Sequence, residues 1–168
     1  MAVGCSTSTT ELSIGGRALY RLRHARRELM IESMSYKKPR ELPRDLLNRV
    51  RLACTELPEV VEEQAWEGTR WTVRGKNFAH LLLIVNGKPE AYARAAGTSG
   101  SACVLTFRLG QEHCAAARFR RAPFFRPVWF PNIAGVIVDA KTDWDEIDEL
   151  LRASYRVLAP RKLGALVE

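Results

Sequence analysis

The sequence predicts one α+β domain over residues 43–168: a two-layer sandwich in which an antiparallel sheet of about five strands carries its N- and C-terminal helices on one side. Apolar residues recur at helical spacing at both ends of this region, and short segments with the alternating pattern of strands lie between them. The pair Asn86-Gly87 is the strongest hairpin signal in the chain and indicates antiparallel neighbours. A length of 168 residues suits a single domain.

Residues 1–40 precede this domain and differ from it in composition. They carry eight basic and three acidic residues, and they begin with a small, polar stretch that is typical of disorder. We expect a basic, disordered extension, with a short helix over residues 17–32 compatible with the spacing of its apolar side chains. Two interpretations stay open: a mobile basic arm, or an extension without a role, since Met34 would serve equally well as the start.

The domain is expected to begin with a helix. Pro43 suits a first helical turn, and the apolar side chains of residues 46–54 form one face that ends near Glu56. We expect a second, acidic helical turn at residues 59–64, because acidic side chains stabilise the first turn of a helix.

Alternating apolar and polar residues indicate the strands of the middle region, which we expect at residues 69–74, 77–85, 89–95, 102–108 and 134–139. Residues 89–95 are interpreted as the return partner of residues 77–85 across the Asn86-Gly87 turn. Residues 111–118 favour a short helix. Three prolines exclude a central strand from residues 123–131.

A last helix is expected near the C-terminus. Thr142 or Asp143 caps its start, and Pro160 ends it. Its apolar residues recur at spacings of three, four and seven, which predicts one buried face. Tyr155 lies on that face, so we expect it in the core.

The motifs of catalytic, metal-binding and membrane proteins are missing from the sequence. None of the four cysteines is spaced as CxxC, which excludes a typical zinc site, and Cys54 and Cys103 are expected to be buried free thiols. The glycine- and serine-rich residues 97–101 lack the lysine of a phosphate-binding loop. No apolar run approaches the roughly 20 residues of a membrane helix. We therefore expect a cytoplasmic protein that is not an enzyme and has no cofactor, no metal, no membrane partner and no small-molecule ligand.

Positive charge is concentrated in one stretch of the domain. Residues 68–126 carry ten basic and two acidic residues, a net charge of +8, between two acidic stretches. Such asymmetry is typical of a surface for a polyanion, and arginine interleaved with aromatic residues suits phosphate contact and base stacking. The candidate nucleic-acid-binding residues are Arg70, Arg74, Lys76, Arg108, Arg118, Arg120, Arg121, Arg126 and Trp129. An ordinary solvated face paired with acidic helices is the competing interpretation.

Residues 143–163 carry an acidic helix start, the pair Ser154-Tyr155 and a basic tail, and they resemble the end of MmcQ/YjbR family proteins. Residues 53–66 and 71–78 also look like the corresponding parts of that family, in the same order. The resemblance covers about residues 46–163 and fits worst over residues 123–135. It implies a compact α+β fold similar to that of CyaY, a DNA-binding role through a double-wing arrangement of strands, and no catalytic residues.

Together these features predict a non-enzymatic, bacterial-type protein that binds DNA or another polyanion weakly and largely through electrostatics. The alternative is a protein-interaction or chaperone-like scaffold that docks its partner on the sheet face or on the aromatic loop at residues 124–130.

Overall fold

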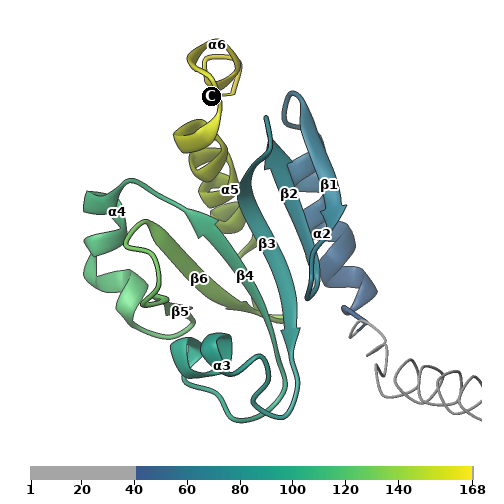
Figure 1. Ribbon diagram of the computed structural model, residues 1–168, viewed down its shortest axis with the longest axis vertical. Helices are drawn as coiled ribbons and strands as arrows, with labels where there is room; N and C mark the ends of the chain where they lie inside the picture. Colours follow the sequence, from purple (N-terminus) through teal and green to yellow (C-terminus); the bar gives the residue numbers. More distant parts are fainter. Residues whose placement is uncertain (1–40, 168) are drawn as a thin grey trace, which may run out of the picture. The chain divides into compact units, whose positions relative to one another are not determined.

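The computed structural model describes residues 41–167, which contain a six-stranded antiparallel sheet and its covering helices (Figure 1). The strands are β1 (Val60–Gln64), β2 (Thr69–Val73), β3 (Lys76–Ile84), β4 (Ala102–Arg108), β5 (Phe124–Phe125) and β6 (Ile133–Val138). Their order across the sheet is β1-β2-β3-β4-β6-β5. The predicted α+β class is confirmed, with six strands in place of about five. The expected N-terminal extension, residues 1–40, lies outside the described residues.

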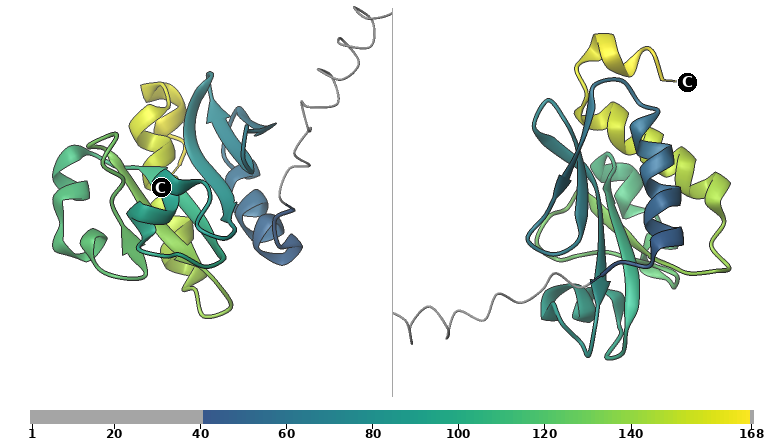
Figure 2. Two further views of the ribbon diagram at one scale, coloured as in Figure 1. Left: turned by 60° about the horizontal axis from the view of Figure 1, so that its bottom comes forward. Right: turned by 90° about the vertical axis from the view of Figure 1, so that its right-hand side faces the viewer.

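Two longer helices, α2 (Arg44–Thr55) and α5 (Trp144–Leu158), cover the same face of the sheet, as predicted (Figure 2). Asp143 begins α5: its carboxylate accepts the backbone N–H groups of Asp145 at 3.2 Å and Glu146 at 3.3 Å. The helix ends before Pro160, and a short helix, α6 (Arg161–Gly164), follows. The main core lies between these helices and the sheet, where Trp71 is fully buried.

The pair Ser154-Tyr155 holds α5 on the rest of the domain. The buried Ser154 hydroxyl donates to the Phe78 carbonyl at 2.6 Å and accepts the N–H of Arg108 at 2.7 Å, so it connects the helix to β3 and β4. Tyr155 is fully buried, and its hydroxyl donates to the Pro58 carbonyl at 2.8 Å. The predicted core position of Tyr155 is confirmed, and both residues of the pair have a structural role.

The opposite face of the sheet carries a smaller apolar cluster under α3 (Glu90–Ala96). Because side chains alternate along a strand, Leu82 and Val104 point to this side, where they join Ala93 of α3 and Phe125 of β5. The Phe125 ring lies directly over Gly135 of β6, and a Cβ atom at that position would overlap the ring. The absence of a side chain at Gly135 therefore lets Phe125 attach the edge strand β5 to the sheet.

Residues 59–64 do not form the expected acidic helical turn, because residues 60–64 are the edge strand β1. The β-branched pair Val60-Val61 favours a strand, and the acidic side chains find partners there. Glu63 lies opposite Arg70 in the register of β1 and β2. Glu62 accepts two guanidinium nitrogens of Arg51, each at 2.8 Å, and this pairing lowers the pKa of Glu62. Cross-strand and helix-to-strand pairing therefore outweighs the helix-dipole preference on which the prediction relied.

Residues 89–95 do not form the expected return strand, because they fold as α3. The Asn86-Gly87 turn itself is present: both residues have positive φ, 51° and 69°, and Val85 pairs with Lys88 across it. After that pair, the alanine-rich stretch has a strong helix propensity. Gly97, in the left-handed conformation with φ of 65°, ends the helix.

The segment that joins β4 to β5 runs through two short helices, α4 (Gln111–Ala115) and the 3-10 helix η1 (Ala117–Arg120). They replace the single short helix expected at residues 111–118. The next segment, residues 121–131, passes over the edge of the sheet and includes β5, so its prolines avoid a central strand as predicted.

Candidate nucleic-acid interface

Three of the nine candidate residues are neutralised by carboxylates. Arg70 lies 2.7 Å from Glu63, and Arg74 lies 2.6 Å from Glu59. Arg118 reaches Glu146 of α5 at 2.9 Å. The competing interpretation, a solvated basic face paired within the molecule, therefore describes these three arginines.

Three further candidates are engaged in packing or hydrogen bonds to uncharged groups. Arg108 donates to the Asn77 carbonyl and to Asn132 Oδ1, both at 3.2 Å. Arg126 donates through Nη2 to the Pro131 carbonyl at 3.1 Å, while its buried Nε has no partner within residues 41–167. Trp129 is half-buried and packs edge-on against Tyr92, with 5.1 Å between ring centroids. The positive charges of Arg108 and Arg126 therefore keep no carboxylate partner in the described structure.

The last three candidates, Lys76, Arg120 and Arg121, are exposed. Within the described part of the chain, none of their side chains makes an ion pair or a hydrogen bond. Lys76 starts β3, whereas Arg120 and Arg121 lie at the end of η1. The nine residues thus do not share one environment, and the cations without a carboxylate partner that lie near one another in sequence are Arg120, Arg121 and Arg126.

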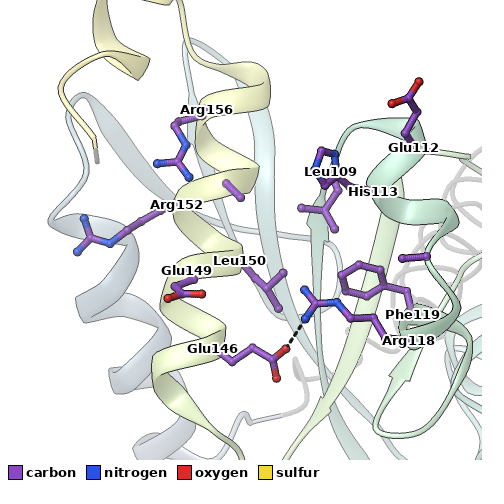
Figure 3. Close-up of a pocket in the computed structure, with 12 residues that line it drawn as sticks. Leu109, Glu112, His113, Arg118, Phe119, Glu146, Glu149, Leu150, Arg152 and Arg156 are labelled. Atoms are coloured by element: carbon purple, nitrogen blue, oxygen red, sulfur yellow. Dashed lines mark hydrogen bonds and ion pairs between the residues drawn. The ribbon is translucent and has the colours of Figure 1, made fainter.

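A first concavity, here called the α5 groove, lies between α5 and the α4–η1 segment and has a volume of about 790 Å³ (Figure 3). Apolar side chains such as Leu109, Phe119 and Leu150 line it, together with charged residues of both signs. Arg118 and Glu146 extend toward each other from its two walls and form the ion pair described above. Positive and negative side chains therefore balance in this groove.

A second concavity, here called the arginine–phenylalanine hollow, has a volume of about 720 Å³. It is lined by the C-terminal end of α3, by Arg120, by most of the segment that includes β5, and by β6, through residues 95–97, 120, 122–128, 130, 131 and 137. Arg120, Arg126 and three phenylalanines are among these residues, and none of the described lining residues is acidic. The hollow therefore combines uncompensated positive charge with aromatic surface.

A pair of aromatic rings separates the two concavities. Phe119 lines the α5 groove and Phe124 lines the hollow. Their ring centroids are 5.2 Å apart in an edge-on arrangement. Arg118 lies over both rings on the groove side, 4.5 Å from the Phe119 centroid and 5.9 Å from that of Phe124. Arg118 and Arg120, two positions apart in η1, consequently serve different concavities.

A chain of three side chains supports the segment that forms the hollow. Trp129 contacts Tyr92 of α3, and the Tyr92 hydroxyl lies 3.4 Å from His80 Nδ1 on β3. His80 Nε2 lies 2.6 Å from the Glu67 carbonyl, which assigns the proton to Nε2 and leaves Nδ1 as the acceptor for the tyrosine. Burial lowers the pKa of His80 and raises that of Tyr92. Both groups are thus held neutral at physiological pH, and Trp129 is a packing residue of this chain.

Phe130 and the α3 wall of the hollow were not among the nine sequence-derived candidates. Phe130 is 50% exposed, and the Arg108 guanidinium lies 5.4 Å from its ring centroid. The sequence placed Phe130 only in the aromatic loop of the alternative hypothesis. The α3 wall was missed because residues 89–95 were interpreted as a strand, although their alanine content is a signal for a helix.

The described residues offer little for metal or thiol chemistry. Cys54, Cys103 and Cys114 are buried free thiols, as predicted for the first two, and burial raises the pKa of Cys103 to about 12. Within residues 41–167, no group of three or more histidine, cysteine, aspartate or glutamate side chains is arranged to hold a metal ion. None of the helices in this range has the length and apolar character needed to cross a membrane.

Comparison with known proteins gives the fold and the family. No curated protein matches the chain. A Pseudomonas syringae protein of known structure has a TM-score of 0.52 and 12% identity, over 70% of this chain and 99% of that one, and at this identity the likeness shows the fold alone. A Deinococcus radiodurans protein with a DUF419 domain has a TM-score of 0.48 and 16% identity, over 72% of this chain and 83% of that one. The YjbR family model matches residues 55–157, more than half of the chain, and the protein therefore belongs to the YjbR family.

Proposed function

We propose that this YjbR-family protein is a non-enzymatic, cytoplasmic nucleic-acid-binding protein that holds DNA weakly through the arginine–phenylalanine hollow. One observation carries the proposal: Arg120 and Arg126 line the hollow together with three phenylalanines and without any acidic side chain among its described lining residues. Cations that have no carboxylate partner attract phosphate, and exposed aromatic rings accept stacked bases.

The arginines that are paired with carboxylates contribute less in this proposal. Arg70, Arg74 and Arg118 would have to leave Glu63, Glu59 and Glu146 before they could bind a phosphate, and the released carboxylates would repel it. Arg120 and Arg121 have no such competitor in the described structure. We therefore narrow the nine sequence-derived candidates to Arg120, Arg121 and Arg126, with Phe124 and Phe130 as aromatic surface.

The aromatic loop gives limited support to the alternative, a protein-docking scaffold. A docking patch requires contiguous exposed apolar surface. Phe125 is buried, and Phe124 is half-buried against Phe119. Phe130 and Val128, which is 97% exposed, are the loop's more accessible apolar side chains. This surface is small beside the positive charge of the adjacent arginines, which favours the nucleic-acid proposal.

The proposal is tested by fluorescence anisotropy of a labelled oligonucleotide titrated with the full chain at several salt concentrations. We expect saturable binding at low salt, with an affinity that falls as salt rises, because each phosphate contact releases counterions. A chain that engages about three phosphates of a single strand should give a log–log slope of about −2. Unmeasurable binding at low salt, or an affinity independent of salt, would refute the proposal.

A further inference from the structure

We propose that the hollow holds an unpaired nucleotide, with its phosphate at Arg120 and Arg126 and its base stacked on Phe130, so that the protein prefers single-stranded over duplex nucleic acid. This inference rests on the proposed function and narrows its ligand. Three properties of the hollow carry it: its concave form, the exposure of Phe130, and the uncommitted donors of its arginines.

The form of the hollow suits an unpaired nucleotide better than a duplex. Its volume of about 720 Å³ falls within the roughly 300–1,000 Å³ range of pockets that enclose small ligands. Its walls come from both the end of α3 and the segment that includes β5. A duplex keeps its bases stacked inside, and extruding one base costs a few kcal/mol. An unpaired strand can place a base in the hollow without that cost.

Phe130 is the aromatic surface available for stacking. Its side chain is 50% exposed, whereas Phe125 is buried and Phe124 is half-buried. Arg108 lies over the Phe130 ring and is itself held by the Asn77 carbonyl and Asn132 Oδ1. The ring is therefore supported by a fixed cation while half of its surface faces solvent. A base stacked there would add to an existing cation–aromatic contact.

The two arginines of the hollow keep donors for a phosphate. A guanidinium carries five N–H donors. Arg126 commits one Nη group to the Pro131 carbonyl, and this bond holds the side chain in place. Burial raises the pKa of the Cys114 thiol, and the Arg126 charge is the main influence that opposes this rise, so that charge is not neutralised locally. Within the described residues, the Arg120 side chain has no partner.

The test compares a labelled 12-nucleotide single strand with the same strand annealed to its complement, by anisotropy with the full chain at low salt. We expect tighter binding of the single strand, and competition by a nucleoside 5′-monophosphate but not by ribose 5-phosphate. Phe130→Ala should weaken single-strand binding by about five- to a hundredfold, the usual value of one stacked base, and change duplex binding by less than about twofold. Trp66→Ala is the matched control, because Trp66 is an 86% exposed aromatic at the β1–β2 turn, outside the hollow.

The possible outcomes separate this inference from the proposed function. Equal affinity for the single strand and the duplex, or equal losses for Phe130→Ala and Trp66→Ala, would overturn the inference and leave the proposed function standing. Failure of both nucleic-acid forms to bind at low salt would overturn the proposed function as well.

Discussion

The α5 groove and the arginine–phenylalanine hollow are similar in volume, about 790 and 720 Å³, and share the Phe119–Phe124 contact as a partition. They differ in how charge is handled. In the groove, Arg118 is paired with Glu146 across the concavity. In the hollow, Arg120 and Arg126 face no acidic side chain among the described lining residues. Two concavities of the same domain therefore present a balanced surface and a positive one.

This difference shows that local basic composition is a poor guide to a binding surface. The net charge of +8 over residues 68–126 treats all ten cations alike. Glu59, Glu63 and Glu146 lie outside that stretch, yet they neutralise three of its arginines. Only the cations left without such partners create a field for a polyanion.

The largest effect is expected from closing the floor of the hollow with Gly135→Val. The new side chain would occupy the place of the Phe125 ring, so β5 should detach, with a loss of about 2–3 kcal/mol in the free energy of unfolding measured with urea. Phe125→Ala in the same protein should recover part of this loss. Gly110→Ala, near the groove, is the control, because its Cβ would meet only an ordinary contact with His113, and it should cost less than about 1 kcal/mol. Equal losses at both glycines would contradict the account of Phe125.

A smaller effect is expected from protonating His80, which supports the hollow through Tyr92 and Trp129. Burial lowers the pKa of His80 in the folded state, so below the ordinary pKa of about 6.5 the unfolded chain binds the proton more readily than the folded one. The stabilisation is complete above pH 6.5 and is lost as pH falls further. Urea unfolding at pH 7.5, 6.5 and 5.5 should show this decline, and His80→Gln should flatten it. A decline that His80→Gln leaves unchanged would assign the effect to other groups.

The smallest effect is expected from Arg118→Gln in the α5 groove. The Arg118–Glu146 pair is largely exposed, so its loss should change the free energy of unfolding by no more than about 1 kcal/mol. Oligonucleotide affinity should change by less than about twofold, because this charge is already neutralised. A tenfold loss of affinity would move the binding surface toward the groove and erase the distinction between the two concavities.

The sequence predicted the parts of the fold that depend on local signals. The alternation in residues 102–108 matches β4, and Asp143 caps the last helix as one of the two residues proposed. Residues 59–64 and 89–95 were assigned wrongly, because the pairing of Glu63 with Arg70 and the capping of α3 by Gly97 depend on residues outside each segment. The hollow itself joins the end of α3 to a segment more than twenty residues later, a juxtaposition that periodicity does not encode.

The central claim is that binding depends on where the uncompensated charge lies rather than on net charge. Arg120→Glu with Arg121→Glu and, as the matched control, Arg161→Glu with Lys162→Glu each lower the net charge from +7 to +3. Arg161 and Lys162 lie on α6, at the other end of the domain from β5 (Figure 1). In salt-dependent anisotropy titrations, the first variant should lose at least tenfold in affinity for a single strand, with a slope smaller by about 1.4 for two lost phosphate contacts, while the second stays within about threefold of the parent protein. Equal losses in the two variants, with both chains folded by circular dichroism, would contradict the account.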